Sequence, residues 1–187
     1  MKKATPSIPS VLQPLVQYLD NLTGRAPLDD LSSLLQDSGV QLRDVRAYVR
    51  FDWHQYRRNL VKEGQWYSLL VLCWRSGQRS PIHDHPDASC AFKVLTGVCT
   101  ETVFDTSPCG QVFPVYTRDR PKGVIVATQD ADTHQVSNLQ TKGQDLVTLH
   151  IYTPPLRSMN RYSIMGEGKM AWTAPEKRTR RPLLRKK

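Results

Sequence analysis

The residues with the clearest chemical potential lie in one short stretch, residues 77–97, GQRSPIHDHPDASCAFKVLTG. His83 and His85 are two positions apart, so on a β-strand both imidazole rings project from the same face. Two neutral imidazoles on one face can converge on a single metal ion. Cys90 follows the second histidine by five positions. The stretch therefore predicts part of a metal site, with a thiol close to it.

The remaining histidines decide whether this site can be completed. Of the five in the chain, His134 lies where a predicted strand begins, and His150 lies within another. A lone histidine is most often a hydrogen-bonded core residue, and that interpretation stays open for His150. Three histidines in one β-rich region, two of them as His-x-His, instead favour a metal bound by His83, His85 and His134.

The first 62 residues are typical of helices that cover one outer surface of a protein. Residues 11–22 and 27–38 carry leucines at spacings of three and four, and a glycine follows each segment. Residues 41–50 have a similar apolar stripe, and a further helical turn is predicted through residues 53–60.

From residue 66 to residue 175 the chain has the pattern of a β-barrel. Residues 66–74 are almost continuously apolar, as expected for a strand buried on both faces. In residues 145–153, DLVTLHIYT, one face is aliphatic and the other becomes polar toward its end. Further strands are predicted at residues 90–95, 98–104, 111–117, 123–129 and 134–139. The fold class is therefore mainly β: an antiparallel barrel or sandwich with a polar interior and helices packed outside.

Length and composition indicate a single domain, residues 1–175, followed by a basic tail. The 187-residue chain is 39% hydrophobic, which suits one folded core. No run of about 18 apolar residues is available to span a membrane, and prolines interrupt the N-terminal apolar segment, so we expect neither a membrane anchor nor a signal peptide. The protein is predicted to be cytoplasmic.

Charge gives little support for a nucleic-acid partner. The net charge is +9, but residues 176–187 account for +6 of it and are expected to form a disordered tail. No DNA- or RNA-binding motif accompanies the tail, so no nucleic-acid partner is expected. The four cysteines lack the CxxC spacing of a zinc or redox motif, and Cys73, Cys99 and Cys109 are predicted to be free thiols.

The spacing of the histidine motif resembles that of a known superfamily. Gly77-x5-His83-x-His85-x4-Cys90-x6-Gly97 resembles the first motif of the cupins in every interval. Cupins usually carry a glutamate ligand at the position of Cys90, so this chain departs from the common pattern there.

A second motif and several other segments make the resemblance more specific. Pro121-x-Gly123 followed by His134-x3-Asn138 resembles the second cupin motif, although the gap before the histidine is longer than usual. Together with YRRNLV, LCW, KVLTGVCTETVFD and LHIYTPP, residues 56–159 resemble the cysteine dioxygenase family of thiol dioxygenases. The resemblance implies a cupin-type barrel and a protein that is typically monomeric.

The resemblance also implies an iron centre and a substrate clamp. His83, His85 and His134 match the family's three Fe(II) ligands. Arg58 matches the arginine that binds the substrate carboxylate, and Tyr56 lies beside it in the sequence. The neighbouring Arg57 has the same charge, and only the family match selects between the two. Met159 matches a substrate-binding position that varies within the family.

A cross-linked pair next to the iron is implied as well. Cys90 and Tyr152 match the residues that the family joins by a thioether bond, and His150 matches the histidine that orients the tyrosine. These three residues are the predicted catalytic group. The interpretation of Tyr152 as an ordinary buried tyrosine remains open at this stage. The Thr153–Pro154 bond matches a cis peptide of the family.

The chemistry implied is the oxidation of L-cysteine by O₂ to cysteine sulfinate. Three neutral imidazoles leave the full charge on Fe(II), which favours a thiolate ligand, whereas the common two-histidine, one-carboxylate site already removes one charge. One alternative is a dioxygenase for 3-mercaptopropionate or another small thiol. Another, of a different class, is a non-catalytic cupin that binds a metal or ligand.

Overall fold

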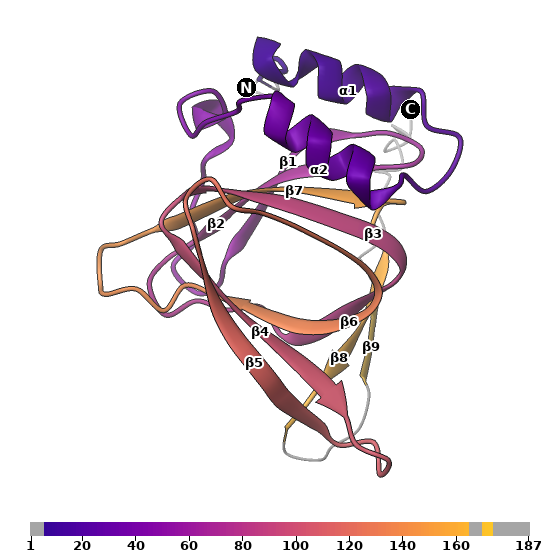
Figure 1. The fold of residues 1–187 in the computed structure, drawn as a ribbon. Helices are drawn as coiled ribbons and strands as arrows, with labels where there is room; N and C mark the ends of the chain where they lie inside the picture. Colours follow the sequence, from indigo (N-terminus) through magenta and orange to yellow (C-terminus); the bar gives the residue numbers. More distant parts are fainter. Residues whose placement is uncertain (1–5, 165–169, 174–187) are drawn as a thin grey trace, which may run out of the picture.

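The computed structural model describes residues 6–164 and 170–173, and it consists of a curved β-sheet with two helices on its outer surface (Figure 1). A single 3₁₀ turn, Ser10–Leu12, leads into α1 (Gln13–Asp20), and α2 (Leu28–Asp37) follows. The predicted tail, residues 176–187, lies outside the described residues.

Nine strands of the described chain form one antiparallel sheet that curls into a barrel (Figure 1). Hydrogen bonding follows the order β1-β2-β7-β3-β6-β4-β5, and β8 pairs with both β3 and β9. This confirms the predicted fold class. The strands are β1 (Arg57–Glu63), β2 (Ser68–Trp74), β3 (Ile82–Thr96), β4 (Val98–Thr106), β5 (Val112–Pro121), β6 (Ile125–Ser137), β7 (Leu146–Thr153), β8 (Ser158–Tyr162) and β9 (Met170–Thr173).

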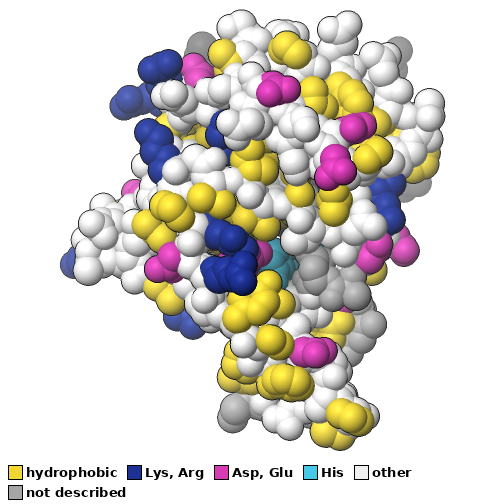
Figure 2. Space-filling view, viewed as in Figure 1, with side chains coloured by type: hydrophobic (Ala, Val, Ile, Leu, Met, Phe, Trp, Pro, Cys, Tyr) yellow, Lys and Arg dark blue, Asp and Glu magenta, His cyan; other side chains and the backbone are white. Residues whose placement is uncertain are grey.

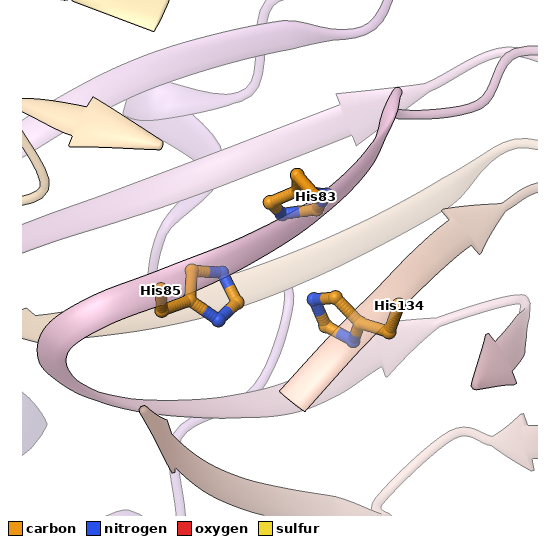
Figure 3. A group of neighbouring side chains, drawn as sticks. All are labelled: His83, His85 and His134. Atoms are coloured by element: carbon orange, nitrogen blue, oxygen red, sulfur yellow. The ribbon is translucent and has the colours of Figure 1, made fainter. Parts of the chain in front are cut away.

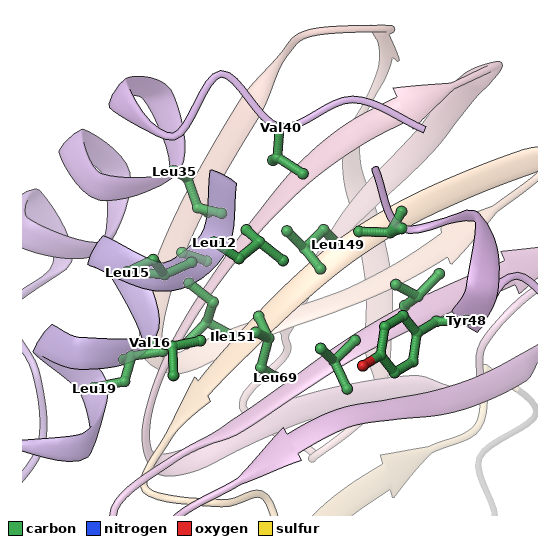
Figure 4. Packing of buried hydrophobic residues seen from close by; sticks show 14 of the residues in the cluster. Leu12, Leu15, Val16, Leu19, Leu35, Val40, Tyr48, Leu69, Leu149 and Ile151 are labelled. Atoms are coloured by element: carbon green, nitrogen blue, oxygen red, sulfur yellow. The ribbon is translucent and has the colours of Figure 1, made fainter. Parts of the chain in front are cut away.

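The central strands β2 and β7 are buried at every position. Every residue of β2 pairs with β7, and alternate side chains enter two different apolar clusters. The outer cluster lies between the sheet and the helices (Figure 4). It includes Leu12, Leu15, Leu19, Leu35, Leu69, Val71, Leu149 and Ile151.

The two helices bury the stripe that the sequence predicts. Leu15 and Leu19 of α1, like Leu31 and Leu35 of α2, are four residues apart and lie on one helical face. The ammonium group of Lys93 on β3 donates to the carbonyl oxygen of Leu35 at 3.2 Å, near the negative end of α2. No helix in the described residues is long and apolar enough to cross a membrane.

The segment before β2 corrects a sequence prediction. The chain forms β1 over Arg57–Glu63, where a helical turn is predicted. In residues 41–50 the only helical element is the 3₁₀ turn Arg46–Tyr48. β1 runs antiparallel to the buried β2, and this pairing outweighs the local helix preference of Arg, Leu and Lys. The helical region therefore ends before residue 57, and the barrel begins there rather than at residue 66.

A second correction concerns β6. The sequence predicts separate strands at residues 123–129 and 134–139, but one strand covers Ile125–Ser137. Its pairing with β3 is irregular near Asp130, which has a left-handed backbone (φ 63°) and an ion pair with Arg25. Bulges of this kind bend a strand and redirect its side chains. The irregularity lies between residues 125–129 of β6, which pair regularly with β3, and His134.

Candidate metal centre

Three buried histidines from two paired strands meet inside the barrel (Figure 3). His83 and His85 come from β3, and His134 of β6 lies directly opposite His83 in the strand register. The ring centroids are 4.8 to 5.0 Å apart. One ring nitrogen from each histidine lies within 4.8 Å of the other two. The structure thus brings together the three metal ligands that the sequence predicts.

Two of these rings have their Nδ1 atoms fixed by hydrogen bonds. His83 Nδ1 lies 2.9 Å from the carbonyl oxygen of Pro81, which can only accept, so this nitrogen carries the proton. His134 Nδ1 lies 3.0 Å from a carboxylate oxygen of Glu101 and donates to it. In both rings the Nε2 atom is therefore the one available to a metal.

The residues present fit a bound transition metal. Burial, followed by the neighbouring His134 and His85, holds the pKa of His83 well below its usual range, so this ring is neutral. Neutral imidazole is a good ligand for iron, zinc, copper and nickel. A buried group of three such nitrogens could hold a divalent ion without any protein carboxylate in direct contact with it.

Cys90 and Tyr152 lie beside this centre as cross-strand neighbours. They are directly opposite each other in the register of β3 and β7, both are buried, and both line the cavity that contains the histidines. Burial, then the nearby Cys90, raises the pKa of Tyr152, so its hydroxyl stays protonated. The structure thus places the two residues of the predicted cross-link at neighbouring positions.

The backbone of Ala26 spans the outer side of the same strand pair. Its N–H donates to the hydroxyl of Thr153 at 3.1 Å, and its carbonyl accepts from the hydroxyl of Ser89 at 3.0 Å. Ser89 directly precedes Cys90, and Thr153 directly follows Tyr152. The loop between α1 and α2 therefore fixes the spacing of β3 and β7 at this position.

A chain of polar contacts leads away from Tyr152. Its hydroxyl lies 3.3 Å from His150 Nδ1, and His150 Nε2 lies 2.9 Å from the hydroxyl of Thr148. The indole N–H of Trp74 donates to the same hydroxyl at 3.2 Å. The ring of Phe92 stacks on His150 with centroids 4.8 Å apart. Burial, then the charge of Arg58, keeps the pKa of His150 well below its usual range.

The structure shows which of the two neighbouring arginines faces the cavity, which the sequence alone does not decide. Arg58 lies opposite Leu72 on the inner face of the sheet, whereas Arg57 lies opposite Cys73 and is exposed. The guanidinium carbon of Arg58 is 5.1 Å from the centre of the Tyr152 ring. Among the described residues, no carboxylate forms an ion pair with Arg58.

The other predicted residues are distributed as follows. Tyr56 lines the cavity and stacks on Trp74, with centroids 4.1 Å apart. Met159 is buried in β8 but is not among the residues that line the cavity in the described part of the chain. The Thr153–Pro154 bond is cis, as predicted.

Sequence reasoning misses three residues of this site. Trp74, at the end of the buried strand predicted at residues 66–74, lines the cavity. Glu101 accepts the hydrogen bond from His134, and Arg120 binds Glu101 in turn. The available signal is weak: Glu101 shares one face of β4 with Cys99, which is buried. The contact of Glu101 with His134 can be predicted only if the pairing of β4 with β6 is known.

The cavity is lined on its remaining sides by hydrophobic and aromatic residues and by Ser80, and it opens toward one face of the molecule. In the space-filling view a histidine is visible near the centre of this face, beside Lys or Arg side chains (Figure 2). Leu72, Val136 and Trp74 complete the apolar part of the lining. A small molecule in this space would contact the three histidines and Arg58.

An antiparallel barrel with an internal His-x-His and a third histidine on the paired strand defines a cupin. One solved structure, an uncharacterised conserved protein with a double-stranded β-helix domain from Klebsiella pneumoniae, has a TM-score of 0.50 and 18% sequence identity to this chain. The match covers 59% of this chain and 81% of that one, and it supports the fold alone.

Sequence comparison identifies the family within this superfamily. Residues 1–165 match the family model for cysteine dioxygenase type I. Cysteine dioxygenase type 1 of Danio rerio is 30% identical over 159 residues, which cover 80% of this chain and 78% of the relative. The Rattus norvegicus protein is 29% identical over 153 residues, covering 79% and 76%. The chain belongs to the cysteine dioxygenase type I family.

Proposed function

We propose that the protein oxidises L-cysteine with O₂ to cysteine sulfinate at an Fe(II) ion held by His83, His85 and His134. The observation that carries the proposal is the position of Arg58. Its guanidinium points into the cavity of the three histidines, and within the described residues it has no carboxylate partner. A small molecule with a thiol at one end and a carboxylate at the other fits these two groups.

Iron bound by the three imidazoles would supply a site at which the substrate thiolate and O₂ react. The histidines contribute no negative charge, so with the metal bound a substrate thiolate would provide the charge compensation that a carboxylate ligand gives in other oxygenases. In the overall reaction both atoms of O₂ go to sulfur, and the thiol proton is released. The cellular compartment in which we expect this to take place is the cytoplasm.

Arg58 holds the substrate carboxylate. Although burial opposes its charge, the neighbouring Tyr152 and Tyr56 raise the pKa of Arg58, so the guanidinium is positively charged. A planar guanidinium binds a carboxylate through two parallel hydrogen bonds, which fix orientation as well as position. The substrate sulfur is thereby directed toward the histidines, and the apolar cavity wall limits the access of water.

Tyr152 supplies a protonated hydroxyl next to the reacting atoms. Its raised pKa keeps the proton in place, and the chain through His150 and Thr148 restricts the orientation of the ring. We propose that Cys90 becomes joined to Tyr152 by a thioether bond. The bond forms with loss of the thiol hydrogen and one ring hydrogen, and O₂ accepts the two electrons.

The test of the activity uses the purified full chain loaded with Fe(II). We expect L-cysteine to drive O₂ uptake with formation of cysteine sulfinate. Uptake with 3-mercaptopropionate but not with L-cysteine would instead assign the other thiol substrate. If zinc were the only tightly bound metal and no thiol caused O₂ uptake, the chain would be a non-catalytic cupin.

The test of the substrate clamp uses two neighbouring arginines. Arg58→Gln should lower kcat/KM for L-cysteine by about 10- to 150-fold, because a hydrogen bond to a charged group contributes about 1.5–3 kcal/mol. Arg57→Gln is the matched control, since this residue is exposed on the same strand. Equal effects of the two substitutions would contradict the assignment of Arg58.

The cross-link is tested by the intact mass of the protein after turnover. We expect a population lighter by two hydrogen atoms, and a peptide that joins Cys90 to Tyr152. Cys90→Ser should abolish this population. A wild-type protein with the unmodified mass after many turnovers would refute the cross-link and leave the dioxygenase assignment to its own test.

A further inference from the structure

His134 differs from His83 in the charge of its hydrogen-bond acceptor. The Nδ1 proton of His83 goes to a neutral backbone carbonyl, whereas that of His134 goes to the carboxylate of Glu101 at 3.0 Å. Glu101 is only 2% exposed. Buried carboxylates are costly unless they are paired, so this one requires a stabilising partner.

That partner is Arg120 of β5. Its Nε and Nη2 atoms donate to the Glu101 oxygen that His134 does not use, at 3.1 and 3.0 Å. The guanidinium of Arg120 and the carboxylate of Glu101 form an ion pair in which the Glu101 side chain is almost fully buried. A guanidinium, a carboxylate and an imidazole are thus joined in line, from the outer strand to the metal centre.

We propose that Glu101 and Arg120 act as a pair of positioning residues that set the electron donation of His134 to the bound metal. This inference rests on the proposed function only in requiring that the three histidines bind a metal. A carboxylate that accepts the N–H of a ligating histidine increases the basicity of the ring. Arg120 opposes this effect, because it draws charge away from the same carboxylate.

The pair also explains how a three-histidine centre works without a carboxylate ligand. Glu101 places a negative charge one hydrogen bond away from the ligand His134, with the imidazole ring between this charge and the metal site. With a metal bound, His134 would therefore be a stronger donor than His83, whose Nδ1 proton goes to a neutral carbonyl.

A purely structural role would be to hold β4 and β5 together, and charge-specific substitutions separate the two roles. Glu101→Gln keeps the size of the side chain and an oxygen acceptor for His134 but removes the charge. Arg120→Gln removes the opposing charge. If the pair sets the electron donation of His134, the two substitutions change the properties of the bound metal in opposite directions. If the pair only holds the β4–β5 hairpin together, both substitutions change those properties in the same direction.

The experiment measures the reduction potential of iron in the full-length protein by a mediator titration. We expect Glu101→Gln to raise the potential, because a negative charge stabilises Fe(III) more than Fe(II), and Arg120→Gln to lower it. Arg118→Gln is the control for loss of a positive charge near Glu101 without loss of a hydrogen bond to it, because Arg118 is opposite Glu101 in the register of β4 and β5. Arg118 is on the same strand, but its guanidinium lies over the Tyr116 ring, 4.8 Å from its centre.

A second measurement does not depend on iron chemistry. Competition with a chelator for Zn(II) should show about 10- to 100-fold weaker binding in Glu101→Gln, and binding in Arg120→Gln that is as tight as wild type or tighter. The proposal would be overturned if Glu101→Gln and Arg120→Gln changed the reduction potential or the Zn(II) affinity in the same direction. It would also be overturned if Arg118→Gln had the same effect as Arg120→Gln. If Glu101→Gln does not fold, the direction in which Arg120→Gln changes the reduction potential decides: a lower potential supports the proposal, and a higher one contradicts it. Failure of the dioxygenase test alone leaves the zinc result interpretable.

Discussion

The two faces of the central strands β2 and β7 are equally buried but have different compositions. On the outer face, Leu69 and Leu149 pack against the helices (Figure 4). On the inner face, Trp74, His150 and Tyr152 line the cavity, and their polar atoms hydrogen-bond to one another or to Thr148. A strand alternates between these environments at every residue.

The comparison shows how one sheet separates stability from chemistry. The outer face provides close apolar packing, which the helices complete and which needs no polar partner. The inner face carries groups that cost free energy to bury, and it compensates through a connected set of hydrogen bonds. Substitutions on the outer face should therefore change stability, and substitutions on the inner face should change metal binding and turnover.

The largest effect is expected from loss of a ligand on the inner face. His85→Ala should abolish thiol-dependent O₂ uptake and weaken metal binding by more than the about 10- to 100-fold that loss of an outer hydrogen-bond partner causes. The thermal midpoint of the metal-free protein should change little by comparison. Metal content and a thermal scan of the same sample test both statements, and retention of a full equivalent of iron would contradict the site.

The opposite pattern is expected on the outer face. Leu149→Ala should lower the free energy of unfolding by about 2–5 kcal/mol, because it leaves a cavity between β7 and the helices. Turnover per folded, metal-loaded molecule should remain close to that of wild type. Denaturant unfolding measures the first quantity, with the more exposed Leu60→Ala as control. A loss of turnover without a loss of stability would show that the two faces are not separate.

The division between the faces could be predicted from the sequence, because it depends only on alternation. Residues 145–153 predict an aliphatic face with Leu149 and a polar face with His150 and Tyr152, and the structure confirms both. The His-x-His pair could be predicted for the same reason. Local periodicity is sufficient wherever a strand is recognised correctly.

The remainder depends on strand pairing, which local pattern does not encode. Arg57–Glu63 has residues that favour helices, and only its pairing with β2 makes it a strand. The roles of Arg57 and Arg58 follow from that pairing, since it decides which of them faces inward. Glu101 reaches His134 only because β4 lies next to β6. These contacts join residues that are far apart in the chain.

A pH dependence of stability should distinguish the inner face from the outer face. His150 has a pKa well below its usual range of about 6.5, so the folded protein does not take up a proton there when the unfolded chain does. Stability should therefore fall as the pH decreases below about 6.5, with a contribution of up to about 1.4 kcal/mol per pH unit from this group. His150→Gln should reduce that slope.

The free energy of unfolding of the metal-free protein, measured from about pH 7 to about pH 5, tests this contribution. This range extends from above to below the pKa of histidine in the unfolded chain, about 6.5. His54→Gln, at an exposed position, should leave the slope as in wild type. Leu149→Ala should lower stability equally at each pH, because it removes no titratable group. An unchanged slope in His150→Gln would mean that other groups on the inner face account for the acid sensitivity.

The smallest expected effect tests whether the hydrogen bonds of the inner face act as a connected set. Trp74→Phe removes the N–H that donates to Thr148 but keeps an aromatic ring beside Tyr56. The loss should be about 0.5–1.5 kcal/mol in stability, since the Thr148 hydroxyl keeps its contact with His150. If Thr148 helps to orient His150 and through it Tyr152, kcat should also decrease, with little change in KM. Trp53→Phe, at a position that is 79% exposed, is the control and should change neither quantity as much. A decrease in stability without any change in kcat would limit the role of Trp74 to packing, and the functional part of the inner face would then end at His150.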